Sequence, residues 1–404
     1  MRTWGITGTN GKTTCTWIFA EFINAISQLP GSPASRSRKC GYLTTVEVFD
    51  GKDRYYTGYT TPPLVQLKEI FAKMEANGCT DCVMEVSSHA IHQNRTGDTV
   101  FSGGAFTNLS EDHLDYHKTM EEYFRVKKSF AEKIAAGVQA RPDNGRKDFP
   151  PYVVCLDGEN GPEMLAAVGQ LPLNVIPVSI ARPHFDLTGL QLTGDYNKSN
   201  VLVAATLAEA AGMPHDVIQR VIPTLKPRWG RLERVENPQV KAEVYVDFAH
   251  TPDGLEKVLT AMRNELARRN IQAFEHSEHS EHSTPSLWVV FGAGGDRDPM
   301  KRPLMGAACA KLADRLVVTS DNPRSEDPMA IIDQIRAGIP SSREGVFIES
   351  DRQAAISFAL SNAAAGDIVV IAGKGHETTQ EIKGIKHPFD DREVVRTFRL
   401  PENS

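Results

Sequence analysis

The feature that most constrains this chain is a glycine loop that directly follows its first strand. Residues 3–7 predict a short buried strand, residues 8–14 read Gly-Thr-Asn-Gly-Lys-Thr-Thr, and residues 15–23 predict an apolar-rich helix. The N–H groups of such a loop and of the helix N-terminus bind anions, Lys12 adds a point charge, and Thr13 can offer its hydroxyl to Mg²⁺. Ile6 occupies the position where the usual phosphate-loop pattern has its first glycine, but Gly8 still gives the turn its freedom. The order of strand, loop and helix therefore predicts a site for a nucleoside triphosphate.

Composition narrows the class of protein. The chain has 404 residues, a formal net charge of −6 and 40% hydrophobic residues, which predicts two or three globular domains. The acidic balance argues against nucleic acid as a partner. No apolar run reaches the length of a membrane span, and the N-terminus lacks the pattern of a signal peptide. We therefore expect a cytoplasmic protein with small-molecule partners and no membrane partner.

The pattern along the chain predicts an α/β fold. Apolar strands alternate with amphipathic helices, as in domains with mostly parallel sheets. Residues 223–231 contain two prolines and a glycine and are the candidate hinge. We predict a central ATP-binding domain at 1–227 and a Rossmann-like α/β domain at 228–404. The strands are expected at 82–86, 106–109, 153–156, 174–179, 243–247, 287–292, 315–319 and 368–372.

Polar residues at the ends of the first-half strands are candidate metal ligands. Glu85 lies near the end of an apolar strand, where a buried carboxylate needs a partner and a metal is the natural one. Asp112 and His113 follow the next strand and could ligate or orient a metal. Such a pair is as often a helix cap beside a packed histidine, so both interpretations stay open here.

Lys127 is the most informative single residue. It falls on the same helical stripe as Tyr123, Phe130 and Ile134, where a lysine is uncommon unless its head group is paired or reaches solvent. An ammonium near Lys12 and Glu85 would repel Mg²⁺, whereas a carbamylated lysine would carry negative charge and could ligate it.

Four strand ends in the second half carry polar loops. These loops lie around residues 247–250, 294–298, 321–324 and 373–377. Their glycines resemble a dinucleotide fingerprint only weakly, because no acidic residue follows at ribose distance. One sheet edge that bears four such loops predicts a ligand site.

Cysteine and histidine clusters elsewhere favour structural interpretations. Cys79 and Cys82 have CxxC spacing, but no second pair completes a metal set, so we expect packing thiols. The His-Ser-Glu repeat at 276–283 could bind metal adventitiously and is expected to be an insertion without a role.

Taken together, the motifs resemble the Mur ligase family, in particular its branch that adds meso-diaminopimelate to UDP-N-acetylmuramoyl-L-alanyl-D-glutamate in peptidoglycan biosynthesis. The resemblance spans most of the chain. In the first half it rests on residues 8–14, Thr60-Thr61-Pro62, residues 85–90, 107–117 and 194–200. In the second half it rests on residues 247–253, 294–298, 321–324 and 373–377.

The resemblance implies a role for each matching residue. The loop residues Gly8, Thr9, Asn10, Gly11, Lys12, Thr13 and Thr14, with Asn197, Asn200, Arg231 and Asp247, would bind ATP. Thr13, Glu85, His113 and a CO₂-derived carbamate on Lys127 would serve Mg²⁺, and Lys12, Glu85, His113 and Lys127 would be catalytic. Thr60, Thr61, Ser87, Gln93 and Arg95 match the acceptor site, while Arg302, Asp321, Asn322, Arg324, Gly373 and Glu377 match the pocket of the incoming amino acid. Arg324 looks like the arginine that takes the distal carboxylate of diaminopimelate.

Two departures from the family pattern leave the acceptor open. Family members carry an N-terminal domain that binds the UDP end of the substrate, which this sequence does not show, and the stretch before Gly194 looks shorter than usual. We expect either the UDP-linked acceptor, with the missing domain on a separate subunit or lost to a mis-assigned start, or a smaller carboxylate. The alternatives are a glutamate ligase like folylpolyglutamate synthetase and a non-catalytic ATP-binding scaffold.

Overall fold

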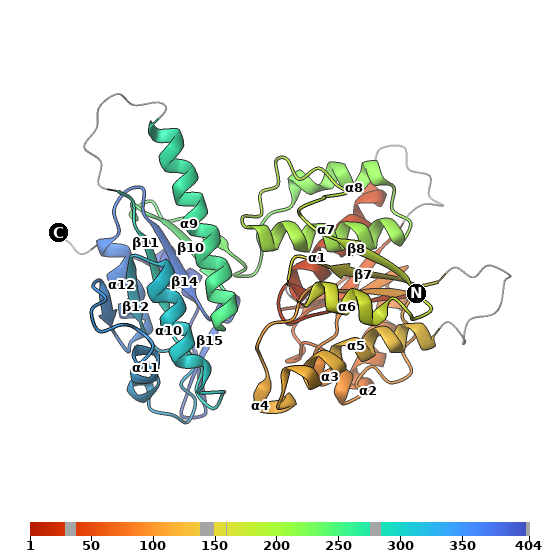
Figure 1. Cartoon of the computed structure of the whole chain (residues 1–404), viewed down its shortest axis with the longest axis horizontal. Helices are drawn as coiled ribbons and strands as arrows, with labels where there is room; N and C mark the ends of the chain where they lie inside the picture. Colours follow the sequence, from red (N-terminus) through yellow and green to blue (C-terminus); the bar gives the residue numbers. More distant parts are fainter. Residues whose placement is uncertain (29–37, 138–148, 159, 275–283, 401–404) are drawn as a thin grey trace. The chain divides into compact units, whose positions relative to one another are not determined.

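The chain forms two compact units. The computed structural model describes residues 1–28, 38–137, 149–158, 160–274 and 284–400. The first unit comprises Met1–Lys226 and the second Pro227–Ser404, and each is described by itself (Figure 1). The roles assigned to the two predicted domains stay predictions.

The first unit is built on an eight-stranded sheet with the order β4-β3-β2-β5-β1-β6-β7-β8. Pairing is parallel except at the β2–β3 and β3–β4 edge. The chain leaves β1 for strands on one side and later returns to its other side, so the end of β1 is a switch point where ligands gather. The strands are β1 (Arg2–Thr7), β2 (Cys40–Leu43), β3 (Val48–Phe49), β4 (Arg54–Tyr55), β5 (Asp81–Glu85), β6 (Gly103–Phe106), β7 (Pro151–Cys155) and β8 (Asn174–Val178).

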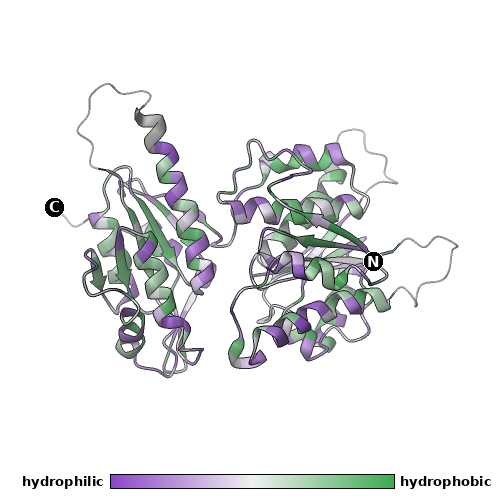
Figure 2. Cartoon of the chain, viewed as in Figure 1, coloured by the Kyte–Doolittle hydropathy of each residue, from purple (hydrophilic) through white to green (hydrophobic). Residues whose placement is uncertain are grey.

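Helices surround this sheet in two groups. Helix α1 packs against α7 and α8, whereas α5 packs against α3 and α6, and Figure 1 shows these groups above and below the sheet. Apolar residues fill the sheet and the inner helix faces (Figure 2), and this burial drives the assembly. The helices are α1 (Lys12–Ala25), α2 (Leu64–Ala76), α3 (Ser88–His92), α4 (Leu114–His117), α5 (Met120–Ala136), α6 (Gly161–Val168), α7 (Asp195–Ala210) and α8 (His215–Val221), with 3₁₀ turns at Ile26–Gln28 and Ile222–Thr224.

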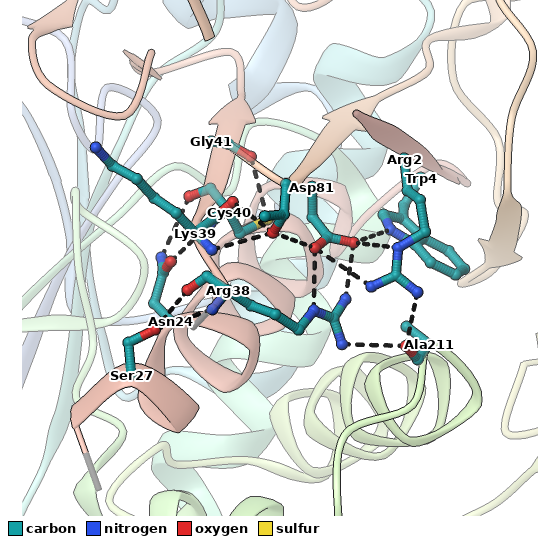
Figure 3. Close-up of polar contacts among 11 residues, drawn as sticks. Arg2, Trp4, Asn24, Ser27, Arg38, Lys39, Cys40, Gly41, Asp81 and Ala211 are labelled. Atoms are coloured by element: carbon teal, nitrogen blue, oxygen red, sulfur yellow. Dashed lines mark hydrogen bonds and ion pairs between the residues drawn. The ribbon is translucent and has the colours of Figure 1, made fainter. Parts of the chain in front are cut away.

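A buried carboxylate marks the start of β5. Asp81 has no exposed surface, and Arg38 donates to it from Nη2 at 2.7 Å and from Nε at 3.1 Å (Figure 3). Arg2 lies 3.0 Å from Asp81 and Trp4 donates its indole N–H. Burial opposes ionisation, but Arg38 holds the pKa of Asp81 below its usual value. Both arginines also donate to the carbonyl oxygen of Ala211, so this cluster ties the start of the sheet to the end of α7.

The second unit has a six-stranded sheet with the order β13-β12-β11-β14-β10-β9. All its pairs are parallel except β9–β10, and a separate hairpin joins β15 to β16. The strands are β9 (Glu233–Val235), β10 (Glu243–Asp247), β11 (Leu287–Phe291), β12 (Arg315–Val318), β13 (Val346–Ile348), β14 (Ile368–Ala372), β15 (Thr379–Ile382) and β16 (Ile385–Pro388).

In the described part of the second unit, five helices occur together with the six-stranded sheet. An apolar core of strand residues such as Val290 and Val369 packs against residues of α12 and α13, including Ile356 and Val395. Within the described ranges, no helix is both long enough and apolar enough to span a membrane. The helices are α9 (Pro252–Phe274), α10 (Lys301–Leu312), α11 (Pro328–Arg336), α12 (Arg352–Asn362) and α13 (Asp391–Thr397).

The predicted α/β class with mostly parallel sheets is confirmed. The strand predicted at 106–109 was misplaced, because β6 ends at Phe106 and begins at Gly103. Glycines are poor strand formers, but a Cβ on Gly103 would lie 2.8 Å from the Trp4 ring, so close packing requires glycine there. All six cysteines are free and buried, as expected for packing thiols. The repeat at 276–283 lies outside the described residues.

Candidate active site

The glycine loop connects β1 to α1 with a backbone that needs glycine at two positions. Gly8 and Gly11 have φ angles of 148° and 83°. A Cβ on Gly8 would lie 1.9 Å from Thr107 Oγ1, and one on Gly11 would lie 2.2 Å from Asn200 Oδ1. The Lys12 ammonium donates to the carbonyl oxygens of Gly8 at 3.0 Å and of the next residue at 2.7 Å. The loop is therefore compact, with its positive charge beside the N-terminus of α1 where an anion would bind.

Residues outside the loop hold it in place, among them Asn108 and Tyr123. The Asn108 side chain accepts from the Asn10 backbone N–H at 3.0 Å and donates to the Asn10 carbonyl at 3.1 Å. The Tyr123 hydroxyl lies 3.1 Å from Thr9 Oγ1. Neither Asn108 nor Tyr123 was predicted as a site residue. Asn108 follows a strand at the loop's own sheet edge, which was the available signal, whereas Tyr123 looks in sequence like an ordinary core residue.

Lys127 lies on the buried face of α5, as its position in the helical stripe predicted. Only 1% of the residue is exposed, and Nζ donates to the Gly8 carbonyl at 2.7 Å. The ammonium also lies 4.7 Å from the centre of the Tyr123 ring. Among the described residues, no carboxylate lies within ion-pair distance of this group. Burial first, and then the charge of Lys12, lower the pKa of Lys127 well below its usual value, although Asp112 opposes the shift.

Glu85 is buried at the end of β5, only 1% exposed. One of its carboxylate oxygens accepts from the Thr45 backbone N–H at 2.8 Å, and the other accepts from the Thr45 hydroxyl at 3.1 Å. The predicted buried carboxylate is therefore present, and the Thr45 groups that bind it are neutral donors. Thr45 was not predicted for the site, because nothing in its local sequence signals this contact.

The predicted acceptor residues form one hydrogen-bonded network beside Glu85. The Thr61 hydroxyl donates to the Glu85 carbonyl at 2.8 Å and accepts from the Ser87 N–H at 3.1 Å. Arg95 donates to the Thr61 carbonyl at 3.1 Å and to the Gln93 side chain at 2.8 Å. Thr60 joins the same network through Thr45. The Thr45 hydroxyl, which donates to Glu85, lies 3.0 Å from the Thr60 hydroxyl. Residues that are up to 35 positions apart in the sequence thus share one surface at the end of β5.

Histidine and tyrosine rings gather next to this network. His113 has a positive φ of 55°, and its Nε2 lies 3.5 Å from a carboxylate oxygen of Asp112. The His113 ring contacts the His89 ring edge-on at 4.9 Å, and His89 in turn lies 4.1 Å from Tyr116. His113 is the N-cap residue of α4, without a side-chain capping hydrogen bond, and its ring packs against other rings. A role for Asp112 and His113 at a metal stays a prediction.

The predicted nucleotide residues are divided between the two units. Asn197 and Asn200 are buried near the start of α7, and Asn200 lies against the glycine loop through its contact with Gly11. Arg231 and Asp247 belong to the second unit, so the structure places them only relative to that unit.

Asp247 and Arg231 share a cluster at the end of β10. Asp247 accepts backbone N–H groups from Leu232 and Ala249 at 2.6 and 2.7 Å. Burial raises its pKa, against the effect of Arg231. The Arg231 guanidinium lies 4.5 Å from the centre of the Phe248 ring.

His376 also packs near Phe248, with the centres of the two rings 4.8 Å apart. Burial first, and then nearby arginines, lower the pKa of His376 to about 3, so the imidazole is neutral. His376 was not predicted as a site residue, although it belongs to the 373–377 motif.

The second unit brings most predicted amino-acid residues together. Lys374 donates to the Asn322 side-chain carbonyl at 3.0 Å and to Glu377 at 2.9 Å. Asn322 also donates to Glu377 at 2.8 Å. A Cβ on Gly373 would lie 2.4 Å from an Asp321 carboxylate oxygen. Loops after β12 and β14 therefore form one polar surface, in which Lys374 is a central residue that was not predicted.

The two arginines predicted for the amino-acid pocket differ in their partners. Arg324 has a φ of 51°, donates to the Gly295 carbonyl at 2.5 Å and lies 3.7 Å from Glu381. Arg302 is almost fully buried and makes a bidentate pair with Glu326 at 2.7 and 2.8 Å. The guanidinium of Arg302 is thus engaged within the unit, while the side chain of Arg324 remains partly exposed.

Comparison with known proteins assigns the chain to a family. The model of the Mur ligase middle domain matches residues 6–208, and the model of the Mur ligase glutamate ligase domain matches residues 230–375. The chain belongs to the Mur ligase family. Mur ligases use ATP and Mg²⁺, and this chain is accordingly an ATP-dependent ligase.

Relatives extend over most of this Mur ligase. It is 38% identical over 408 residues to the UDP-N-acetylmuramoyl-L-alanyl-D-glutamate--2,6-diaminopimelate ligase of Caulobacter vibrioides, covering 98% of this chain and 78% of the relative. It is 36% identical over 402 residues to the protein of the same name from Clostridioides difficile, covering 97% and 77%. A solved structure of such a ligase is similar with a TM-score of 0.57 at 31% identity, covering 98% of this chain and 77% of the other. A folylpolyglutamate synthase of Mycobacterium tuberculosis shares the fold, with a TM-score of 0.60 at 18% identity over 92% of this chain and 88% of the other.

Proposed function

We propose that this Mur ligase joins the amino group of a diaminopimelate-type amino acid to the glutamyl carboxylate of UDP-N-acetylmuramoyl-L-alanyl-D-glutamate, at the expense of ATP. The names of relatives at 34–38% identity support this assignment. The structural observation that carries the proposal is the position of Lys127, an almost fully buried amine that touches the Gly8 carbonyl.

We propose that Lys127 carries a CO₂-derived carbamate. Its amine is surrounded by conditions that favour the neutral form, since burial and Lys12 both lower its pKa, and only a neutral amine can react with CO₂. The amine nitrogen bonds to the carbon of CO₂ and releases one proton, which leaves a negatively charged carbamate next to the Lys12 ammonium. The pairing of the carbamate with the Lys12 ammonium would then offset the free-energy cost of burying a charge here.

The residues present fit Mg²⁺ at this edge of the sheet. Glu85 offers carboxylate oxygens, Thr13 a hydroxyl, His113 an imidazole, and a carbamate on Lys127 would add two oxygens, a mainly hard donor set of the kind that Mg²⁺ takes. When bound, Mg²⁺ would neutralise charge on the phosphate oxygens. Lys12 and the N–H groups of the glycine loop would hold those phosphates in place.

The reaction needs two displacements. The acceptor carboxylate attacks the γ-phosphorus and ADP leaves, which gives an acyl phosphate; Lys12 stabilises the charge on the transferred group. The neutral amine of the incoming amino acid then attacks the acyl carbon, phosphate departs and a proton is released, which leaves an amide. The network of Thr60, Thr61 and Arg95 would position the acceptor beside Glu85.

The second unit would select the amine. We propose that Arg324 binds the distal carboxylate of the amino acid in a bidentate pair, which the ammonium of lysine could not form. Asn322, Gly373 and Glu377 would line the rest of the pocket. Arg302 would act by holding the loop at Gly294, to whose carbonyl it donates at 3.1 Å.

An ATP-dependent phosphate-release assay tests the function. The purified chain would be given diaminopimelate or lysine with each of three acceptors: UDP-N-acetylmuramoyl-L-alanyl-D-glutamate, the free Ala-Glu dipeptide, and folate with glutamate. We expect release that depends on diaminopimelate and the UDP-linked acceptor. If phosphate is released with the free dipeptide but not with the UDP-linked acceptor, the dipeptide would be the acceptor instead. Phosphate release only with folate and glutamate would contradict the proposal.

A further inference from the structure

Two histidines and a glutamate meet at the C-terminal end of α7, on a part of the first unit that the ligase chemistry does not use. His184 Nε2 lies 3.0 Å from one carboxylate oxygen of Glu209, and His215 Nδ1 lies 2.9 Å from the other. Their ligating atoms all lie within 4.8 Å of one another. We propose that these three side chains form a surface site for Zn²⁺ or a similar imidazole-binding divalent cation.

The chemistry of the three side chains fits this cation. Two imidazoles and one carboxylate are a common zinc donor set, with bonds of about 2.0–2.2 Å and remaining positions for water. Tetrahedral ligands at such lengths are about 3.3 Å apart, so the two imidazole–carboxylate pairs are already close to the required spacing. Small rotations of His184 and His215 would complete the geometry.

The neighbouring residues fix the ligands before any metal binds. Phe185 is buried, which anchors His184 through the adjacent backbone. The Phe185 ring also stacks on His215, with centres 4.6 Å apart and planes 12° apart. The segment that carries His184 is tied down further by Gln219, which accepts from the Asp186 N–H at 3.0 Å and donates to the Asp186 carbonyl at 2.7 Å. Such preorganisation lowers the entropic cost of binding.

Electrostatics favours a cation beside Glu209. Glu209 is the penultimate residue of α7, where the helix dipole disfavours a negative charge and the last turn offers no basic residue. A divalent cation held by the two imidazoles would compensate the charge of this carboxylate.

A cation at this site would link three segments of the first unit. Residues 179–194 contain no strand, and they return the chain from β8 to α7. A cation held by His184, Glu209 and His215 would fasten this return segment to the joint between α7 and α8 (Figure 1). Metal binding to the folded form alone then raises the stability of the unit.

Zinc titration of the full chain tests the site. All proteins would carry serine in place of His276, His279 and His282, because this repeat offers imidazoles of its own. Calorimetry without ATP or Mg²⁺ is expected to give one site with a Kd of about 10 µM or tighter, and zinc is expected to raise the Tm. His184→Ala, His215→Ala and the isosteric Glu209→Gln should each weaken binding at least about tenfold and abolish the Tm shift. His387→Ala removes an exposed imidazole of β16 and should change neither result.

Three outcomes would overturn the proposal. The first is that no zinc binds below about 100 µM. The second is that His184→Ala and its parent bind zinc with equal affinity, which would place the zinc elsewhere, for example near His89 and His113. The third is that the Tm values of these two proteins differ by an amount that zinc does not change. The last result would mean a hydrogen-bonded cluster only. Cobalt provides an independent readout, because its visible absorption should appear in the parent and be lost in His184→Ala, whichever variant folds less well.

Discussion

The two ends of β5 both bury charge, but they compensate it differently. At the start of the strand, Asp81 is surrounded by Arg2, Arg38 and the Trp4 indole. At the other end, the side-chain hydrogen bonds that Glu85 accepts within the described part of the chain come from the neutral donors of Thr45. Lys127 is buried at the same sheet edge, and no carboxylate of the described residues lies within ion-pair distance of it. A folded protein leaves a buried charge uncompensated at a free-energy cost. The start of β5 therefore has the properties of a structural cluster, and its end those of a binding site.

Replacement of Lys127 should have the largest effect. Lys127→Ala is expected to lower ATP-dependent phosphate release by about 10³-fold, because the proposed carbamate, and with it a charged ligand of Mg²⁺, would be lost. Short carboxylates such as acetate should restore part of the rate if a carbamate is the active form. Lys128→Ala is the matched control, since Lys128 pairs with Glu132 in the next turn. An unchanged rate in Lys127→Ala would contradict the proposed mechanism.

Removal of the Asp81 carboxylate should affect stability and spare the chemistry. Asp81→Ala leaves Arg38 partly buried without its partner, which is expected to cost about 3 kcal/mol in urea unfolding. The KM for ATP of the folded protein should stay within about twofold of the parent. Asp98→Ala removes an exposed partner of Lys68 and should leave the urea midpoint almost unchanged, because solvent screens exposed ion pairs. Equal losses in the two variants would mean that burial does not distinguish these carboxylates.

Neutralisation of Glu85 should give the opposite result to that of Asp81. Glu85→Gln keeps the shape of the side chain, so the free energy of unfolding should change by no more than about 1 kcal/mol. Phosphate release should fall by about 10²-fold and its Mg²⁺ requirement should rise, since a charged metal ligand is lost. A magnesium titration of activity, set beside urea unfolding, measures both quantities. A variant that unfolds easily but needs no additional Mg²⁺ would make Glu85 a structural residue like Asp81.

The pH dependence of stability should carry the smallest signal. In CO₂-free buffer the folded pKa of Lys127 is lowered, so between that pKa and its unfolded value the unfolded chain holds a proton that the folded chain lacks. The free energy of unfolding should therefore rise with pH across this window, by at most about 1.4 kcal/mol per pH unit. Lys127→Met should lack this contribution, as comparison of urea midpoints at several pH values would reveal. Parallel pH profiles of the two proteins would contradict the buried, uncharged amine.

Long apolar segments made much of the fold predictable. The strands predicted at 243–247 and 368–372 have the observed bounds of β10 and β14. Strands that are buried on both faces are rich in β-branched and other apolar residues, and such short apolar runs are easy to recognise in a sequence. The short strands β3, β4 and β13, at or next to a sheet edge, were not predicted. They contain only two or three residues, and their pairing depends on neighbours that are distant in the sequence. The start of α7 at Asp195 is also hard to predict, because the first turn of this helix is polar.

The site was predictable where one residue breaks a local pattern. Lys127 interrupts an apolar stripe and Glu85 ends an apolar strand, so each is conspicuous in the sequence. Thr45 and Lys374 break no pattern, and their roles follow from contacts with Glu85 and Glu377 that only folding creates. The cluster of His184, Glu209 and His215 was missed for the same reason, since three separate segments bring its side chains together.

The sequence by itself determined the α/β class, the phosphate loop and the buried position of Lys127, because hydrophobic periodicity and glycine requirements act over a few neighbouring residues. Only the tertiary structure decided which buried charges are compensated. Asp81 and Lys127 both look like charges in apolar surroundings, but Arg2 and Arg38 reach Asp81 from distant segments, whereas Lys127 meets a backbone carbonyl and the repulsion of Lys12. Coulomb interactions depend on distance in space and on burial, and a linear chain specifies neither until it folds.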